Sequence, residues 1–102
     1  MHPEVLNRSA EIEQLCRRFG VRRLELFGSG ATSAFDPGKS DLDFLVDLGD
    51  AQPVVYADAF FGLRESLEKL FGRPVDLVTE RSVVNPYLRQ GIDRGRRLLY
   101  AA

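Results

Sequence analysis

Apolar residues recur at helical spacing in two long segments of the chain. Over residues 4–19 they come every three or four positions, and Gly20 follows as a stop signal. The longest such pattern covers residues 54–71 and closes at Gly72. Both segments therefore predict amphipathic helices that bury one face.

A further helix is predicted near the carboxyl end. Asn85 suits the cap position and Pro86 the first helical position, and the pattern stops at Gly95. The polar stretch that runs to a turn signal at residues 36–38 has room for one helical turn. About four helices are expected in total.

Short segments between these helices predict strands, because their apolar residues alternate with polar ones or form a brief continuous run. The segments are Val21–Phe27, Asp41–Leu48, Val75–Thr79 and Arg96–Tyr100. Helices and strands alternate along the chain, and no linker divides it. We therefore expect one α/β (α+β) domain over residues 1–102, with a small sheet packed against about four helices.

Two aspartates open the second predicted strand. Side chains on a strand alternate between faces, so Asp41 and Asp43 project together, about 7 Å apart, while Leu42 and Phe44 point toward the core. Two neighbouring carboxylates repel each other and resist burial. A divalent cation shared between them is the usual reason for such a pair, so we predict a metal site here. The alternative is a strand start whose acids are satisfied by solvent or by a helix N-terminus.

Asp76 supplies a third carboxylate. It lies in the third predicted strand and faces away from Val75 and Leu77. If that strand neighbours the one that begins at Asp41, all three acids can share one face of the sheet. Three converging carboxylates would hold two Mg²⁺ ions, which take oxygen ligands and commonly bind substrate phosphates as well.

Gly28 and Ser29 follow the first predicted strand. A glycine there lets the backbone approach a ligand closely, and exposed N–H groups after it favour phosphate. The Ser29 hydroxyl adds a hydrogen-bond donor. Such a pair is common in turns, and it becomes specific only through its place before the paired aspartates.

Composition narrows the functional classes. The chain is 44% hydrophobic, carries a net charge of -1 and has a pI near 5.8, so it has no strong field for nucleic acid or membrane. Its arginine-rich groups at residues 17–23 and 94–97 are interpreted as solvated faces, although the planar guanidinium of arginine also makes them candidates for pairing with a nucleotide or an acidic partner. The single cysteine, Cys16, excludes a disulfide framework and a cysteine-based metal site. No signal peptide or membrane span is predicted, and a cytoplasmic location is expected.

The combined motifs resemble those of the minimal nucleotidyltransferases, in the DNA polymerase β-like superfamily. The segments that carry the likeness are Leu26-Phe27-Gly28-Ser29, Ser40-Asp41-Leu42-Asp43-Phe44-Leu45-Val46 and Val75-Asp76-Leu77-Val78. The resemblance implies a nucleotidyltransferase fold with a small mixed sheet. It also implies transfer of a nucleoside monophosphate from a nucleoside triphosphate, usually ATP.

The resemblance further implies a role for each motif residue. The catalytic and metal-ligating residues are then Asp41, Asp43 and Asp76, and the nucleotide-binding residues are Gly28, Ser29 and Ser40. By the family pattern Asp41 and Asp43 ligate both Mg²⁺ ions. Asp76 ligates one of them and accepts the proton of the acceptor hydroxyl. Gly28 and Ser29 hold the β- and γ-phosphates.

One run departs from the family pattern. Members usually carry Ala-Arg-Gly just after the Gly-Ser pair, and here the corresponding residues are Ala31-Thr32-Ser33. The absent arginine would have offered charge to the triphosphate, a role that Lys39 or another arginine could take over. Larger relatives also append a helical domain that binds the acceptor, and no such domain is expected here.

Two functions from different classes fit these observations. In the first, the chain is a Mg²⁺-dependent enzyme that moves AMP from ATP to a protein acceptor. Minimal members often act as the antitoxin of a HEPN ribonuclease toxin, some by adenylylating a tyrosine on it, so the resemblance implies a HEPN-type partner. In the second, a degenerate nucleotidyltransferase neutralises its partner by binding alone. A second copy of the chain could also complete the site.

Other chemistries fit less well. Modification of a small molecule or an RNA end would need a dedicated pocket or a basic groove. An EF-hand needs a glycine and a glutamate at positions that Asp41-Leu42-Asp43 does not supply. A glycosyltransferase could use an Asp-x-Asp pair but needs a longer chain. Ser29 as a covalent nucleophile lacks a base, because the single histidine, His2, lies at the terminus.

Overall fold

A computed structural model describes residues 3–28 and 41–102 of the chain. Its elements in chain order are α1 (Pro3–Leu6), α2 (Ser9–Arg18), β1 (Arg23–Phe27), β2 (Leu42–Asp47), α3 (Pro53–Phe71), β3 (Val75–Thr79), the 3-10 helix η2 (Glu80–Ser82), α4 (Pro86–Gly95) and β4 (Arg97–Ala101). The strands form one sheet in the order β3-β2-β1-β4. β2 pairs antiparallel with β1 and parallel with β3, so the expected small mixed sheet is confirmed.

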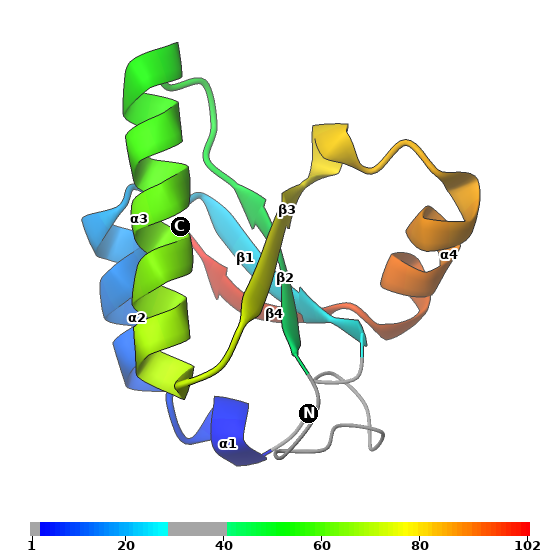
Figure 1. The fold of residues 1–102 in the computed structure, drawn as a ribbon, viewed down its shortest axis with the longest axis horizontal. Helices are drawn as coiled ribbons and strands as arrows, with labels where there is room; N and C mark the ends of the chain where they lie inside the picture. The colour runs from blue at the N-terminus through cyan, green and yellow to red at the C-terminus, as the bar shows by residue number, and fades with distance from the viewer. Residues whose placement is uncertain (1–2, 29–40) are drawn as a thin grey trace.

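Helices cover both faces of this sheet. α2 and α3 lie on one face, and α4 lies on the other (Figure 1). Beneath α2 and α3, alternate residues of the strands form the main core, among them Leu24, Leu26 and Phe44, all 0% exposed. Cys16 of α2 is buried in the same core, which raises the pKa of its thiol to about 12 and agrees with an inert structural role.

A second, smaller core lies under α4 on the opposite face. Its buried residues are Phe27, Leu45, Val83 and Ile92, with the partly buried Val78 packed against them. Phe27, Leu45 and Val78 come from the three strands that carry the motif residues, whereas Val83 follows η2 and Ile92 lies on α4. The sheet therefore has one fully covered face and one face that α4 covers only in part (Figure 1).

The first predicted helix divides into two. The chain turns at Asn7 and Arg8, where the N–H of Arg8 donates to the carbonyl of Val5 at 3.1 Å and tightens the end of α1. Asn and Ser favour such local turns over a helix interior. The apolar pattern still holds across the break, because Val5 and Ile12 both enter the main core.

The remaining elements lie close to their predicted bounds. α3 begins at Pro53 and ends at Phe71, and Gly72 after it has a φ of 63°, the left-handed cap conformation that glycine favours. Asn85 caps α4 by accepting the N–H of Tyr87 at 2.8 Å. Among the described helices, none combines the length and apolar character needed to cross a membrane.

Candidate active site

Asp43 and Asp76 lie side by side on the face of the sheet that α4 shares. β2 and β3 are parallel neighbours, and their register pairs Asp43 with Asp76, about 4.8 Å apart along the hydrogen-bonding direction. Their strand neighbours Leu42, Phe44 and Val75 are buried on the opposite face. The predicted adjacency of the two strands is therefore correct, and it brings these carboxylates to one place.

Asp41 lies just before β2 and is exposed, so the strand begins one residue later than predicted. It is near enough to act on Asp43 electrostatically. The pKa of Asp43 is raised to about 6, first because burial penalises its charge, then because Asp76 and Asp41 repel it. All three acids thus contribute to one electrostatic environment.

The backbone of Gly28 lies next to the side chain of Asp43. It follows β1, whose last residue Phe27 is the register partner of Asp43. Its φ is 69°, and a Cβ placed on it would lie 2.5 Å from Oδ2 of Asp43. A side chain at this position would have to displace the Asp43 carboxylate, so the motif glycine allows that carboxylate to lie against the backbone.

The donor chemistry of these acids fits a hard divalent cation, because Mg²⁺ prefers carboxylate oxygens and water. Within residues 3–28 and 41–102, no three acid, histidine or cysteine side chains already stand close enough together to form a closed metal cage. Asp41 and Asp76 are exposed, however, and can turn toward a cation at Asp43. The half-buried Asp43, repelled by two like charges, is the group that such a cation would stabilise most.

Several predicted site residues lie outside the described part of the chain. These are Ser29, Ser40, Lys39 and the run Ala31-Thr32-Ser33. Their proposed contacts with a nucleotide stay predictions.

A polar cavity of about 320 Å³ lies at the other end of β2, between its last residues and η2. Asp47, Asp50, Arg22, Arg81 and Tyr56 contribute to its lining. Asp47 shares the face of Asp43, but it is exposed and accepts the N–H of Gly49 at 2.8 Å. The paired acids do not line this cavity, so we place the chemistry at Asp43 and not there.

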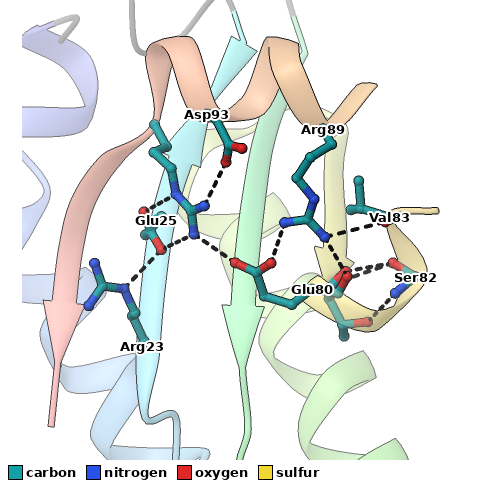
Figure 2. Close-up of polar contacts among 9 residues, drawn as sticks. Arg23, Glu25, Glu80, Ser82, Val83, Arg89 and Asp93 are labelled. Carbon is teal, nitrogen blue, oxygen red and sulfur yellow. Dashed lines mark hydrogen bonds and ion pairs between the residues drawn. The ribbon is translucent and has the colours of Figure 1, made fainter. Parts of the chain in front are cut away.

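The sequence interpretation missed a polar network on the same face. Glu25 of β1 is only 3% exposed, and the guanidinium of Arg96 donates to both of its oxygens at 2.7 Å (Figure 2). Arg96 therefore does not belong to a solvated face, and its guanidinium pairs instead with an acidic side chain of the same chain. A charged residue among alternating apolar positions of β1 was the available signal, since a buried glutamate needs a cationic partner.

The two tyrosines at apolar positions of the predicted helices differ in exposure. For Tyr56 and Tyr87 the helical spacing favours a place in the core or in an interface over the role of an acceptor hydroxyl. Tyr56 is partly buried against the main core, whereas Tyr87 is 82% exposed because α4 turns that side away from the sheet.

Comparisons with known proteins agree with this geometry. The family model described as a nucleotidyltransferase domain matches residues 10–99. The chain is 32% identical over 90 residues to a protein of Methanocaldococcus jannaschii whose assigned name is that of a protein adenylyltransferase, covering 88% of this chain and 86% of that protein. It is 37% identical over 75 residues to the protein adenylyltransferase MntA of Thermococcus cleftensis, covering 74% of this chain and 72% of the relative.

Solved structures show the same fold. A structure described as a minimal nucleotidyltransferase matches with a TM-score of 0.65 and 33% identity, covering 95% of both chains. A chain from a complex of a tri-AMPylated Shewanella oneidensis HEPN toxin with its MNT antitoxin matches with a TM-score of 0.62 at 21% identity, covering 96% of this chain and 73% of that one. From the family match and the relatives above 30% identity, the chain belongs to the nucleotidyltransferase-domain family, as one of its minimal nucleotidyltransferases.

Proposed function

We propose that this chain transfers AMP from ATP to a hydroxyl group of a partner protein, and that the partner is a HEPN-type toxin which it neutralises. The observation that carries the proposal is the pairing of Asp43 with Asp76 beside the side-chain-free backbone of Gly28. The names of the relatives support the protein acceptor, and the toxin–antitoxin complexes among the structural neighbours support the partner.

Each residue of the proposed site has its own role in the transfer. Gly28 holds the backbone close to Asp43, so a phosphate group at the end of β1 would meet the acids directly. Asp41, Asp43 and Asp76 would hold Mg²⁺, which would neutralise phosphate charge and stabilise the charge that develops at phosphorus. Asp76 is exposed and lies on the edge strand β3, which supports its proposed role of receiving a proton from an approaching acceptor.

The proposed reaction is an in-line displacement. The acceptor oxygen forms a bond to the α-phosphorus of ATP while the bond from that phosphorus to pyrophosphate breaks. The hydroxyl proton passes to the carboxylate of Asp76, which acts as general base. The products are the adenylylated partner and pyrophosphate.

A labelling experiment tests this proposal. The chain is incubated with ATP labelled at the α-phosphate, Mg²⁺ and the candidate partner, which is the purified protein encoded by the gene next to its own. Label on the partner that is lost with Asp43→Ala, and kept with Asp47→Ala on the same strand and face, is the expected result. Equal labelling by the Asp43 and Asp47 variants would contradict the assignment of Asp43.

A second function is supported by the run Ala31-Thr32-Ser33, which lacks the arginine of the family pattern. In this alternative the chain neutralises its partner by binding alone. No transfer of label, together with partner binding that Asp43→Ala leaves unchanged, would favour it.

A further inference from the structure

The helix α4 packs directly beside the acid pair. Along β2, the next residue on the face of Asp43 is Leu45, and along β3, the next residue on the face of Asp76 is Val78. Both belong to the small core that Ile92 of α4 completes. The position of α4 therefore decides how open the acid-bearing face is next to these carboxylates.

Apolar packing alone holds α4 weakly. Ile92 is its one buried residue among the positions 86–95, and Tyr87 and Leu88 point outward with 82% and 47% exposure. A helix of ten residues with a single buried side chain can tilt or slide on the sheet unless other contacts fix it.

One guanidinium supplies such contacts. Arg96, directly after α4, donates to Glu25 of β1, to Glu80 of η2 at 2.7 Å and to Asp93 of α4 at 2.9 Å. Figure 2 shows the carboxylates of these residues turned toward the same group. We call Arg96 and its three acid partners the Arg96 latch. It ties the end of α4 to the central strand β1 and to the segment that follows β3.

A second arginine fixes the start of the helix through the same acid. Arg89 pairs with the carboxylate of Glu80 and donates to the carbonyl oxygens of Glu80 at 2.9 Å and Val83 at 3.3 Å. Arg89 thus holds the segment between β3 and α4 against the helix. Both ends of the helix converge on Glu80.

A buried ion pair of this kind is weak evidence for added stability, because removing charges from water opposes folding. Glu25 has 4% side-chain exposure, and an apolar residue there could pack on the small core instead. The charged arrangement instead fixes the position of α4 on the sheet. The donor directions of a guanidinium are fixed, so three carboxylates can pair with it in only a few arrangements.

We propose that Arg96 is a positioning residue that holds α4 at the side of the active site from which the protein acceptor approaches. The inference rests on the proposed transfer to a protein acceptor. Loss of the latch should affect the acceptor more than the nucleotide. Asp43 and Asp76 are fixed by backbone pairing within the sheet, and Gly28 by its contact with Asp43, so none of these depends on α4.

The test compares Arg96→Gln with Arg23→Gln. Arg23 also donates to Glu25, at 2.9 Å, but it lies on β1 itself, has 52% side-chain exposure, and its ion pair with Glu25 stays within that strand. For Arg96→Gln we expect about a tenfold rise in the KM for the acceptor found by labelling, with the KM for ATP within twofold of the wild type. Amide hydrogen exchange should accelerate in α4 and stay unchanged in β2 and β3. Arg23→Gln should change neither quantity.

Arg96→Lys provides a second variant, because it keeps the charge but cannot bridge three carboxylates, and its acceptor KM should fall between wild type and Arg96→Gln. The proposal is overturned if Arg96→Gln lowers the melting temperature yet matches Arg23→Gln in acceptor KM and α4 exchange. A rise in the KM for ATP equal to that for the acceptor would also overturn it. If the wild type labels no partner, the proposed transfer fails separately, and the latch is judged by α4 exchange and by the Kd of the partner.

Discussion

At Gly28, backbone conformation and the neighbouring carboxylate both exclude a side chain. The φ of 69° is costly for any other residue, and the space beyond its Cα is occupied by Asp43. We expect Gly28→Ala to displace the Asp43 carboxylate and to abolish transfer, with a stability loss of about 1–2 kcal/mol from the left-handed backbone. Transfer assays and urea unfolding measure the two effects separately.

Gly72→Ala is the matched control for this prediction. Gly72 has a similar φ of 63°, but a Cβ there would meet nothing within 4 Å. It should lose a similar amount of stability, about 1–2 kcal/mol, and keep full activity. If both variants are equally active, Gly28 has no role beyond its backbone conformation.

The burial of the Asp43 carboxylate and its repulsion by Asp76 and Asp41 predict a gain in stability when its charge is removed. Its pKa of about 6 lies above the ordinary value of 3.8, so the charged form is disfavoured in the metal-free folded protein. At pH 7, Asp43→Asn should raise the free energy of unfolding by about 1 kcal/mol, well below the full value of the shift because the carboxylate is only half-buried. Chemical unfolding without divalent cations measures this, and Asp47→Asn should show no gain.

At the scale of the helices, replacing a glycine by alanine should raise stability in α4 and lower it in α3. Gly91 lies within α4, and a Cβ there would meet nothing within 4 Å. Gly91→Ala should therefore stabilise the protein by about 0.5–1 kcal/mol through helix propensity. In α3, a Cβ on Gly62 would lie 2.6 Å from the ring of Phe19, at the end of α2.

Gly62→Ala should consequently lower stability by about 1 kcal/mol, because crowding at the contact between α2 and α3 exceeds the gain in helix propensity. Thermal unfolding of both variants under one condition is the measurement. A Gly62→Ala protein as stable as Gly91→Ala would show that Phe19 moves aside without cost.

How far the sequence predicts each element depends on whether its pattern is local. The strands and α3 follow from alternation, helical spacing and cap residues, all of which lie within a few positions of one another. The acid pair was predictable because Asp43 and Asp76 lie at equivalent places in strands that proved to be neighbours. The break at Asn7 was missed because the apolar spacing from Val5 to Ile12 continues across it.

The partners of Arg96 could not be read from the sequence, for a different reason. Glu25 and Glu80 lie 71 and 16 positions away, so their pairing exists only once β1, η2 and the end of α4 have met. A single glutamate in a strand pattern signals that a cationic partner exists, yet several arginines could have filled that role. Tertiary packing makes the choice.

For the whole molecule, the acids on the face of the sheet that carries α4 change the folding stability with pH in opposite directions. The pKa values of Glu25 and Glu80 are lowered from 4.5, for Glu25 first by the hydrogen bond from Arg96 and for Glu80 first by that from Arg89. A lowered folded-state pKa gives stability that is present above pH 4.5 and lost as the pH falls through the folded value. At Asp43 the raised pKa gives a penalty that is absent below pH 3.8 and complete above about 6.

The metal-free protein should therefore be most stable between about pH 4.5 and 6, where Glu25 and Glu80 are charged and paired with their arginines and Asp43 still carries a proton part of the time. Urea unfolding from pH 3 to 8 measures this profile. Asp43→Asn should remove the decline on the alkaline side, because it removes the raised pKa of Asp43. Arg96→Gln should reduce the decline on the acid side, because it removes the largest cause of the lowered pKa of Glu25 and part of the cause for Glu80. A wild-type stability that rises steadily from pH 5 to 8 would mean that burial and repulsion do not disfavour the charged form of Asp43. The electrostatic argument that Asp43 and its neighbouring acids bind a cation would then fail.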